Sequence, residues 1–276
     1  NAEPYPTWRF RAGGCVIEQT LCMAAGEDTT FIRFRIVEGS KSVQLTVRPL
    51  CTSRHFHHLT HYQDMGPPTV EVGDQQVDMQ WSQGRPGYRL SHNGTYKSRP
   101  DWYYQFVLST EWGRGYDATE DLFMPGLILK TLTAGESTGL VIAATTQKTT
   151  WNAWPFAFEN AAARAESAQR ATGARDGLAE SLSRASSDFI VSRGTDQKTV
   201  VAGYPWFADW GRDTFISLPG LCLVTGRFAE ARGILQTFAK YVDRGMIPNR
   251  FPDYGEAPAY DTADAMLWYI HSMDRY

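Results

Sequence analysis

Alternating apolar and polar residues dominate the first half of the chain, a period of two that is typical of β-strands with one buried face. Phe31–Val37 and Val43–Val47 show it most clearly. Weaker forms of the pattern predict further strands at Cys15–Met23, Glu71–Val72, Val77–Trp81, Trp102–Leu108, Leu127–Leu132 and Leu140–Thr145. Turn residues separate these segments, as at Gly73-Asp74 and Asn93-Gly94. Many short antiparallel strands predict a β-sandwich, which we assign to residues 1–150.

From about Asn152 the apolar residues recur at helical spacing instead. Residues 159–171 are alanine-rich and polar, which predicts a connecting helix within a linker over residues 151–176. Leu178, Leu182, Ala185 and Phe189 then recur at helical intervals. The second half therefore consists mainly of helices.

Further helices are predicted to begin near Asp213, to cover about Phe228–Val242, and to begin near Thr262. Pro219 is expected to kink or shorten the first of these, and Gly245 to cap the second. A few helices with apolar stripes cannot close a ring alone. We therefore assign residues 177–276 to the first helices of a larger, incomplete helical barrel, so that the expected fold class is two-domain α+β.

Size and charge exclude several classes of function. The chain has 276 residues, which is enough for two domains. It carries 27 basic and 30 acidic residues without a basic block, so neither nucleic acid nor an anionic membrane is an indicated partner. Its apolar stretches are also shorter than the ~20 residues that span a bilayer.

The cysteines indicate the compartment. Cys15, Cys22, Cys51 and Cys222 lack a CxxC spacing and lie in apolar segments, where a free thiol behaves as a small hydrophobic group. A reducing cytoplasm is the simpler interpretation. The chain starts without Met or a signal sequence, and residues 266–276 look like an unfinished helix, so we expect a piece of a longer protein.

The most informative segment is YPWFADWGRDTFISLPG, which starts at Tyr204. It places the aromatic residues Trp206 and Trp210 beside the charged residues Asp209, Arg212 and Asp213. An indole stacks on the C–H face of a pyranose, while carboxylate and guanidinium groups pair with its hydroxyls, so the segment predicts a sugar-binding site. The alternative is an ordinary helix start that Asp213 caps, and both can hold together.

A second loop rich in Pro and Gly, residues 245–265, ends in Asp261 and Asp264. Asp261 is a candidate N-cap for the last helix, and Asp264 lies one turn further on. If this helix points the same way as the one near Asp213, both helix starts share one rim of a barrel. The alternative is two ordinary capped helices.

Two further clusters of polar residues stand out in the first half. The histidines His55, His57, His58 and His61 suggest a metal, but no Cys or carboxylate nearby completes a zinc spacing, so we favour a hydrogen-bonded loop and expect no metal. In residues 111–126, four carboxylates surround Arg114. These carboxylates either face a substrate cleft or, as we favour, form ion pairs that dock the sandwich on the helices.

The helical motifs are highly specific. Three segments resemble the amylo-α-1,6-glucosidase part of glycogen debranching enzymes, as in bacterial and archaeal members. They are the segment from Tyr204, GMIPNRF from Gly245 and YDTADAMLWY from Tyr260. RHFHHL from Arg54 and EWGRGYD from Glu111 resemble the N-terminal domain of that family. The resemblance covers nearly the whole chain.

That resemblance implies a β-sandwich followed by an (α/α)6 barrel, and hydrolysis of α-1,6-linked glucose in glycogen or limit dextrin with inversion. It implies that Trp210, Arg212 and Asp213 hold glucose, that Asp264 and Asp261 line the same pocket, and, less directly, that Trp206 and Asp209 contribute. No metal or organic cofactor is implied. The acid and base motifs of the family are absent from these residues, so the chain alone is expected to be inactive.

Two other functions stay open at this point. One is a non-catalytic protein that binds α-glucans. The other is a different (α/α)6 glycosidase, such as a trehalase-like or glucoamylase-like enzyme. Oligomeric state and chain-length preference are not addressed by any pattern in the sequence.

Overall fold

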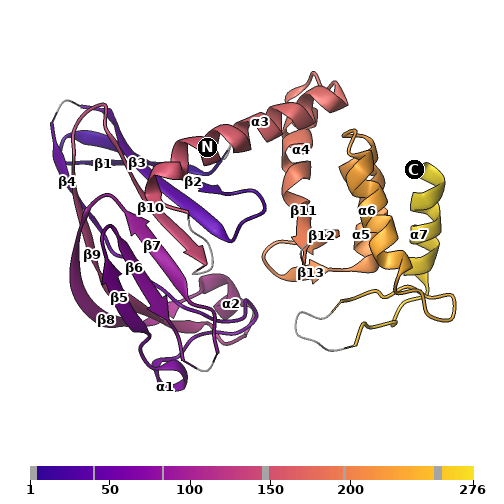
Figure 1. Ribbon diagram of the computed structural model, residues 1–276, viewed down its shortest axis with the longest axis horizontal. Helices are drawn as coiled ribbons and strands as arrows, with labels where there is room; N and C mark the ends of the chain where they lie inside the picture. Colours follow the sequence, from indigo (N-terminus) through magenta and orange to yellow (C-terminus); the bar gives the residue numbers. More distant parts are fainter. Residues whose placement is uncertain (1–4, 40, 83, 145–148, 195–196, 252–256) are drawn as a thin grey trace. The chain divides into compact units, whose positions relative to one another are not determined.

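The chain folds into two compact units, Asn1–Ala161 and Ala162–Tyr276 (Figure 1). The structure is a computed structural model that describes residues 5–39, 41–82, 84–144, 149–194, 197–251 and 257–276. Antiparallel strands form most of the first unit, and helices form most of the second. The expected two-domain α+β organisation is therefore confirmed. The two units meet in sequence within helix α3 (Trp154–Thr172), inside the predicted linker.

Two antiparallel sheets make up the first unit. The larger has the strand order β1-β2-β3-β10-β7-β6-β5 and the smaller has the order β4-β9-β8. The strands of the larger sheet are β1 (Thr7–Ala12), β2 (Cys15–Met23), β3 (Thr29–Glu38), β5 (Thr69–Gly73), β6 (Gln76–Gln80), β7 (Tyr88–His92) and β10 (Ser137–Ala144). Those of the smaller sheet are β4 (Val43–Val47), β8 (Thr95–Val107) and β9 (Thr119–Leu132), and two short helices, α1 (Tyr62–Met65) and α2 (Ser109–Gly113), lie in the loops.

A shared apolar core joins the two sheets face to face. Met79 and Leu90 of the larger sheet are fully buried and belong to the same cluster as Phe123 and Ile128 of the smaller sheet. This arrangement is the sandwich that the alternating pattern predicts. The predicted strand over Leu140–Thr145 corresponds to β10, with Thr145 outside the described residues.

Glu18 is a buried carboxylate at the centre of strand β2. It lies directly opposite Arg9 of β1 and Arg35 of β3 in the sheet, and its oxygens accept hydrogen bonds from both guanidinium groups at 3.1 and 2.7 Å. Burial by itself raises the pKa of Glu18, but the two arginines outweigh burial, so the net pKa is lowered. The ionised carboxylate therefore ties three strands together.

We expect Glu18→Gln to lower the free energy of unfolding by about 1–3 kcal/mol at pH 7, because two charge-assisted hydrogen bonds are lost. The folded-state pKa lies below the unfolded value of about 4.3, so the stabilisation is present above that pH and disappears as pH falls through the folded pKa. Urea unfolding of both proteins at pH 7 and pH 3 measures this. Glu38→Gln, which alters an exposed pair with Arg11 on β1, is the control and should cost less than about 0.5 kcal/mol.

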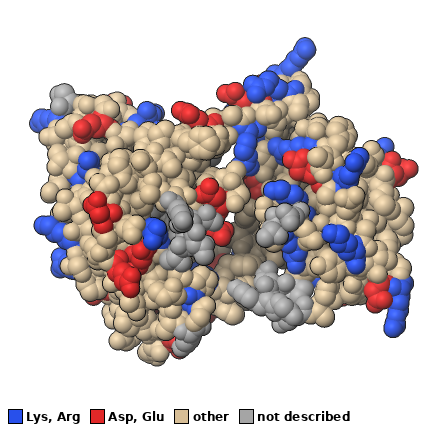
Figure 2. Space-filling view, in the orientation of Figure 1, with Lys and Arg blue, Asp and Glu red and all other residues tan. Residues whose placement is uncertain are grey.

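All four cysteines are free and buried, as predicted. Within the described ranges, no helix is long and apolar enough to cross a membrane. Acidic and basic side chains are interspersed on the face that Figure 2 shows, and each unit carries both signs.

The second unit combines helices with a small sheet that the sequence did not predict. Its helices are α4 (Gly177–Ala185), α5 (Gly211–Leu218), α6 (Phe228–Ala239) and α7 (Asp264–Arg275). Short 3-10 turns cover Trp151–Ala153, just before α3, and Ser186–Phe189, just after α4. The sheet has the order β11-β12-β13, with β11 (Ile190–Arg193), β12 (Gln197–Gly203) and β13 (Phe207–Asp209).

The three helices α5, α6 and α7 share one core. Phe215, Phe238 and Tyr269 stack edge to face with centroid separations of 4.8 and 4.9 Å, one residue from each helix. Helix α5 ends at Leu218 and passes into a single π-helical turn, Pro219–Leu223, so the expected interruption at Pro219 is confirmed.

The predicted cap at Gly245 is wrong. Helix α6 ends at Ala239 with Lys240 as its C-cap. Gly245 instead lies in a tight turn in which Asp243 and Met246 exchange backbone hydrogen bonds of 2.9 and 2.8 Å. Its φ of +81° follows a φ of +48° at Arg244, a pair of left-handed residues that suits a two-residue hairpin turn.

Candidate functional site

The segment that the sequence singled out leads from β13 into helix α5. Strand β13 pairs with β12 through Val201 opposite Asp209, and the Trp206 N–H donates to the Gly203 carbonyl at 3.1 Å. Trp206 itself is 39% exposed. Trp210 is half-buried and packs edge to face on Phe207, with ring centroids 5.9 Å apart. The turn and strand thus present aromatic rings immediately before the helix.

Asp209 is buried and anchors this strand from within. Its Oδ2 accepts hydrogen bonds from Arg193 Nη1 at 2.6 Å and from Thr199 Oγ1 at 3.0 Å. Burial raises the pKa of Asp209, and the Arg193 guanidinium opposes that rise. Arg193 also lies over the Phe251 ring, 4.4 Å from its centroid. The carboxylate therefore joins β13 to β11 and β12.

Asn249 provides the hydrogen bonds that begin helix α5. Its backbone carbonyl accepts the Gly211 N–H at 2.6 Å, and its side-chain Oδ1 accepts the Arg212 N–H at 3.2 Å. Trp210 occupies the N-cap position and makes no side-chain cap. The alternative in which Asp213 caps this helix is therefore wrong, because a residue from a distant loop accepts the Gly211 and Arg212 N–H groups.

Gly211 lies where the chain passes closest to that loop. A Cβ built on Gly211 would be 2.3 Å from the Pro248 carbonyl oxygen, far inside van der Waals contact. Only glycine leaves room for residues 248–250 to cross the helix start, where Trp210 and Arg250 also form a β-bridge. Residues 248–250 are therefore packed directly against the start of α5.

The structure brings Arg212 and Asp264 together. Arg212 Nη1 lies 3.6 Å from Asp264 Oδ2, and both side chains are roughly half exposed, at 42% and 44%. Helices α5 and α7 run in the same direction, since further along Ser272 Oγ donates to the Phe215 carbonyl at 2.6 Å. The two helices therefore begin at the same end, as the shared-rim hypothesis expected.

Asp213 and Asp261 lie near this pair without joining it. Asp213 is in the first turn of α5 and is partly exposed, whereas Asp261 is exposed in the loop before α7. Ala263 occupies the N-cap of α7 without a side-chain cap, so the prediction that Asp261 caps this helix is wrong. Among the residues that the structure describes, neither Asp213 nor Asp261 takes part in the ion pairs of this region.

These groups could recognise a polyhydroxylated ligand. A half-exposed guanidinium and carboxylate supply donors and acceptors side by side, and the neighbouring indole of Trp210 supplies an apolar face. The starts of two helices add the positive ends of their dipoles. Among the described residues, no three or more His, Cys, Asp or Glu side chains are grouped so that they could hold a metal ion.

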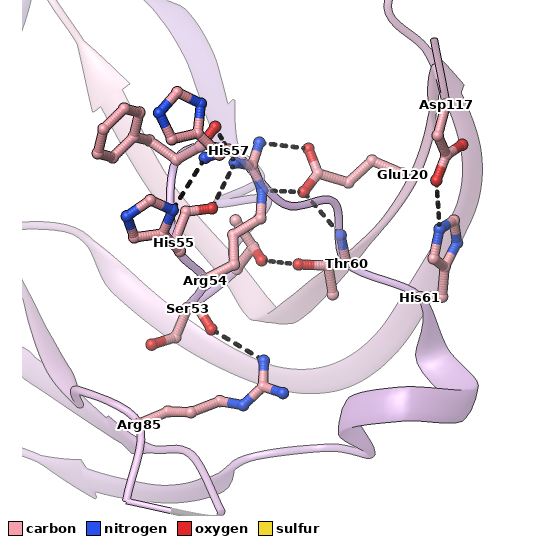
Figure 3. Close-up of polar contacts among 11 residues, drawn as sticks. Ser53, Arg54, His55, His57, Thr60, His61, Arg85, Asp117 and Glu120 are labelled. Carbon is pink, nitrogen blue, oxygen red and sulfur yellow. Dashed lines mark hydrogen bonds and ion pairs between the residues drawn. The ribbon is translucent and has the colours of Figure 1, made fainter. Parts of the chain in front are cut away.

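A second cluster of polar contacts lies in the first unit, between residues 53–61 and the start of β9 (Figure 3). Glu120 accepts a bidentate pair from Arg54 through Nε and Nη2, and also the Thr60 N–H at 3.1 Å. Arg54 Nη1 donates to the carbonyls of His55 and Phe56, both at 3.3 Å. The buried pair therefore closes the loop.

The histidines of this loop take part in hydrogen bonds. The His57 N–H donates to His55 Nδ1 at 3.3 Å, and His61 Nε2 lies 3.3 Å from Asp117 Oδ2 (Figure 3). This agrees with the predicted hydrogen-bonded loop. Of the other carboxylates, Glu111 pairs with Arg114 at 3.3 Å. These contacts all lie inside the first unit, and docking of the sandwich on the helices stays a prediction.

Sequence reasoning missed two residues of the site, Asn249 and Arg193. In the sequence, Asn249 is one residue of the motif that starts at Gly245, and nothing in that motif indicates its role. Arg193 lies in a strand that was not predicted, and no local signal marked it as the partner of Asp209.

Comparison with known proteins agrees with this division of the chain. Residues 1–138 match the family model described as glycogen debranching enzyme N terminal, and residues 184–276 match the model described as amylo-alpha-1,6-glucosidase. A stretch of 88 residues, 30% of the chain, is 40% identical to the glycogen debranching enzyme of Saccharomyces cerevisiae and covers 6% of that enzyme.

Proposed function

Because the chain belongs to the glycogen debranching enzyme family, we propose that its second unit forms part of the glucose-binding site of an amylo-α-1,6-glucosidase. The full-length protein would hydrolyse α-1,6 branch linkages of glycogen or limit dextrin with inversion. The observation that carries this proposal is the Arg212–Asp264 pair at the adjoining starts of two parallel helices, with Trp210 at the N-cap of the first. We propose the cytoplasm as its compartment, where four free thiols are stable.

Helix directions support an (α/α)6 barrel in the complete enzyme. Helix α6 runs opposite to α5 and α7, since Phe228 near its start stacks on Tyr276 at the end of α7. Alternating directions are what successive helical hairpins of such a barrel require. Apolar side chains on α5 and α7 are also largely exposed, among them Ile216 at 49%, Leu267 at 66% and Ile270 at 51%. Further barrel helices would cover them.

The acids in this region suit binding better than proton transfer. Inverting hydrolysis needs a carboxylic acid and a carboxylate about 6.5–9.5 Å apart across the bond. Asp264 is paired with Arg212, and Asp209 is buried against Arg193 and Thr199. We therefore assign Asp209 to positioning, and Arg212, Asp213, Asp264, Trp210 and, more distantly, Asp261 and Trp206 to sugar contact.

In this proposal the general acid and base are other carboxylates, so the 276-residue chain binds glucose units without releasing glucose. Two carboxylates and water suffice for the reaction, and it requires neither a metal nor an organic cofactor. Glucose released from branched dextrin by the purified chain would contradict this assignment.

The test uses Arg212→Lys in the full-length protein. We expect kcat/KM for glucose release from α-1,6-branched limit dextrin to fall about 100-fold, since Lys keeps the charge but loses the planar fork of donors. Arg114→Lys is the matched control, because Arg114 also lies in a Trp-Gly-Arg sequence and pairs with a carboxylate at 3.3 Å. Equal losses in both variants, or release from trehalose or linear maltose in preference to branched dextrin, would refute the proposal.

A further inference from the structure

Strand β8 contains a β-bulge whose backbone is unusual. The pairing of β8 with β9 shifts register between Tyr103, opposite Leu122, and Phe106, opposite Glu120. Within the bulge Gln105 has a φ of +56°, in the left-handed region that residues with a side chain seldom adopt. Such conformations persist where the surrounding structure enforces them, and bulges often redirect a side chain at a functional surface.

Asp121 holds this bulge in place. Its Oδ1 accepts the Gln105 N–H at 2.9 Å, while its Oδ2 accepts the Tyr62 N–H at the start of helix α1 at 3.0 Å. One carboxylate thus ties the bulge to a segment 43 positions earlier in sequence, with both oxygens used on backbone donors. The conformation is therefore fixed from two sides.

The bulge and α1 together present two tyrosines to solvent. Tyr104 is 58% exposed and Tyr62 is 44% exposed, and their rings meet edge to face with centroids 6.1 Å apart. The Trp102 ring packs edge to face on Tyr62, with ring centroids 5.3 Å apart. We call Tyr62 and Tyr104 the tyrosine shelf.

We propose that the tyrosine shelf is a second α-glucan-binding site, separate from the Arg212–Asp264 site, that stacks on the pyranose faces of a glycogen chain. This inference rests on the proposed function for the identity of its ligand. Tyrosine combines a flat apolar ring with a hydroxyl, and three residues that adjoin the shelf in sequence, Gln63, Asp64 and Gln105, are polar and exposed. Amide and carboxylate groups at the rim of a ring suit a ligand with many hydroxyls better than an apolar protein surface.

A site of this kind binds its ligand without catalysing a reaction. Glycogen repeats the same sugar along every chain, so a polymer bound at the shelf can reach a second site on the same protein, and the two contacts raise the overall affinity. The shelf would bind the polymer, and free glucose would bind to the shelf only weakly.

The test measures glycogen affinity of the 276-residue chain by native electrophoresis in gels containing glycogen, with excess glucose to occupy the Arg212–Asp264 site. We expect Tyr104→Ala and Tyr62→Ala each to weaken glycogen binding about fivefold to tenfold, as loss of an aromatic contact does. Tyr104→Phe keeps the ring and should retain most of the affinity. Phe10→Ala removes a ring that is 50% exposed on β1 and should change nothing.

The outcomes separate the two proposals. Unchanged glycogen affinity in Tyr104→Ala, or no glycogen binding by the wild-type chain in excess glucose, overturns the shelf and leaves the Arg212 assignment standing. Loss of affinity in Tyr104→Ala with normal kinetics for Arg212→Lys supports the shelf and refutes the proposed function. A change in self-association of Tyr104→Ala, without any change in glycogen affinity, would identify a protein interface and also overturn the shelf.

Discussion

Gly211→Ala is expected to lower the free energy of unfolding by about 3 kcal/mol or more, near the upper end of the cost of overpacking. The added Cβ would lie 2.3 Å from the carbonyl oxygen of Pro248, which belongs to backbone and cannot rotate away. Either residues 248–250 move or helix α5 shifts, and both break the hydrogen bonds that Asn249 makes to Gly211 and Arg212. Urea denaturation followed by tryptophan fluorescence measures the loss.

Gly233→Ala is the matched control. Gly233 lies inside helix α6, and its added Cβ would meet nothing within 4 Å. The same substitution should stabilise the protein there by about 0.5–1 kcal/mol, because Ala is the better helix former. If both variants had similar stability, the close approach of residues 248–250 to α5 would be wrong.

Arg54→Met is the second variant with a large expected effect, a loss of about 3–5 kcal/mol in the free energy of unfolding. The side chain of Glu120 is 7% exposed, so removal of its partner leaves a carboxylate buried with only the Thr60 N–H as a donor among the contacts described here. The carbonyls of His55 and Phe56 also lose their donor, which should loosen the loop in Figure 3. Urea denaturation measures the cost, and hydrogen exchange at residues 55–60 measures the loosening.

The control here is Arg114→Met. Arg114 pairs with Glu111 on the surface, where its side chain is 56% exposed, so the substitution should cost less than about 0.5 kcal/mol. A double variant, Arg54→Met with Glu120→Gln, should recover part of the lost stability because the buried charge is gone. A double variant less stable than Arg54→Met alone would contradict this explanation.

Strands such as β3 and β4 could be predicted from the sequence. Apolar and polar residues alternate along them because one face of each strand is half-buried. Strand β7 was missed because three of its five residues, Leu90, Ser91 and His92, are buried without an apolar pattern. Strands β11 and β13 have four and three residues, too few for a period to show between helices. Their partners in the sheet, rather than their own composition, define them.

The candidate site was predictable in its residues and less so in their roles. Charged residues near two helix starts pointed to Arg212 and Asp264, and these two do lie together. The expected caps failed because the donors of α5 find Asn249, 37 residues from Arg212, and local sequence gives no sign of so distant a partner. Asp209 looked like its neighbours in sequence, and only its contact with Arg193 reveals its different role.

The long-range origin of the Arg212 contacts links ligand binding to folding. Arg114 finds its partner within one helical turn, but Arg212 depends on Asn249 and Asp264, which reach it only after residues 248–250 and the start of α7 have packed against α5. A partly folded second unit therefore has no site to offer. Any sugar that binds there selects the completed fold, and its binding free energy adds to the stability of the second unit. In a melting experiment, such a ligand should raise the temperature at which the second unit unfolds.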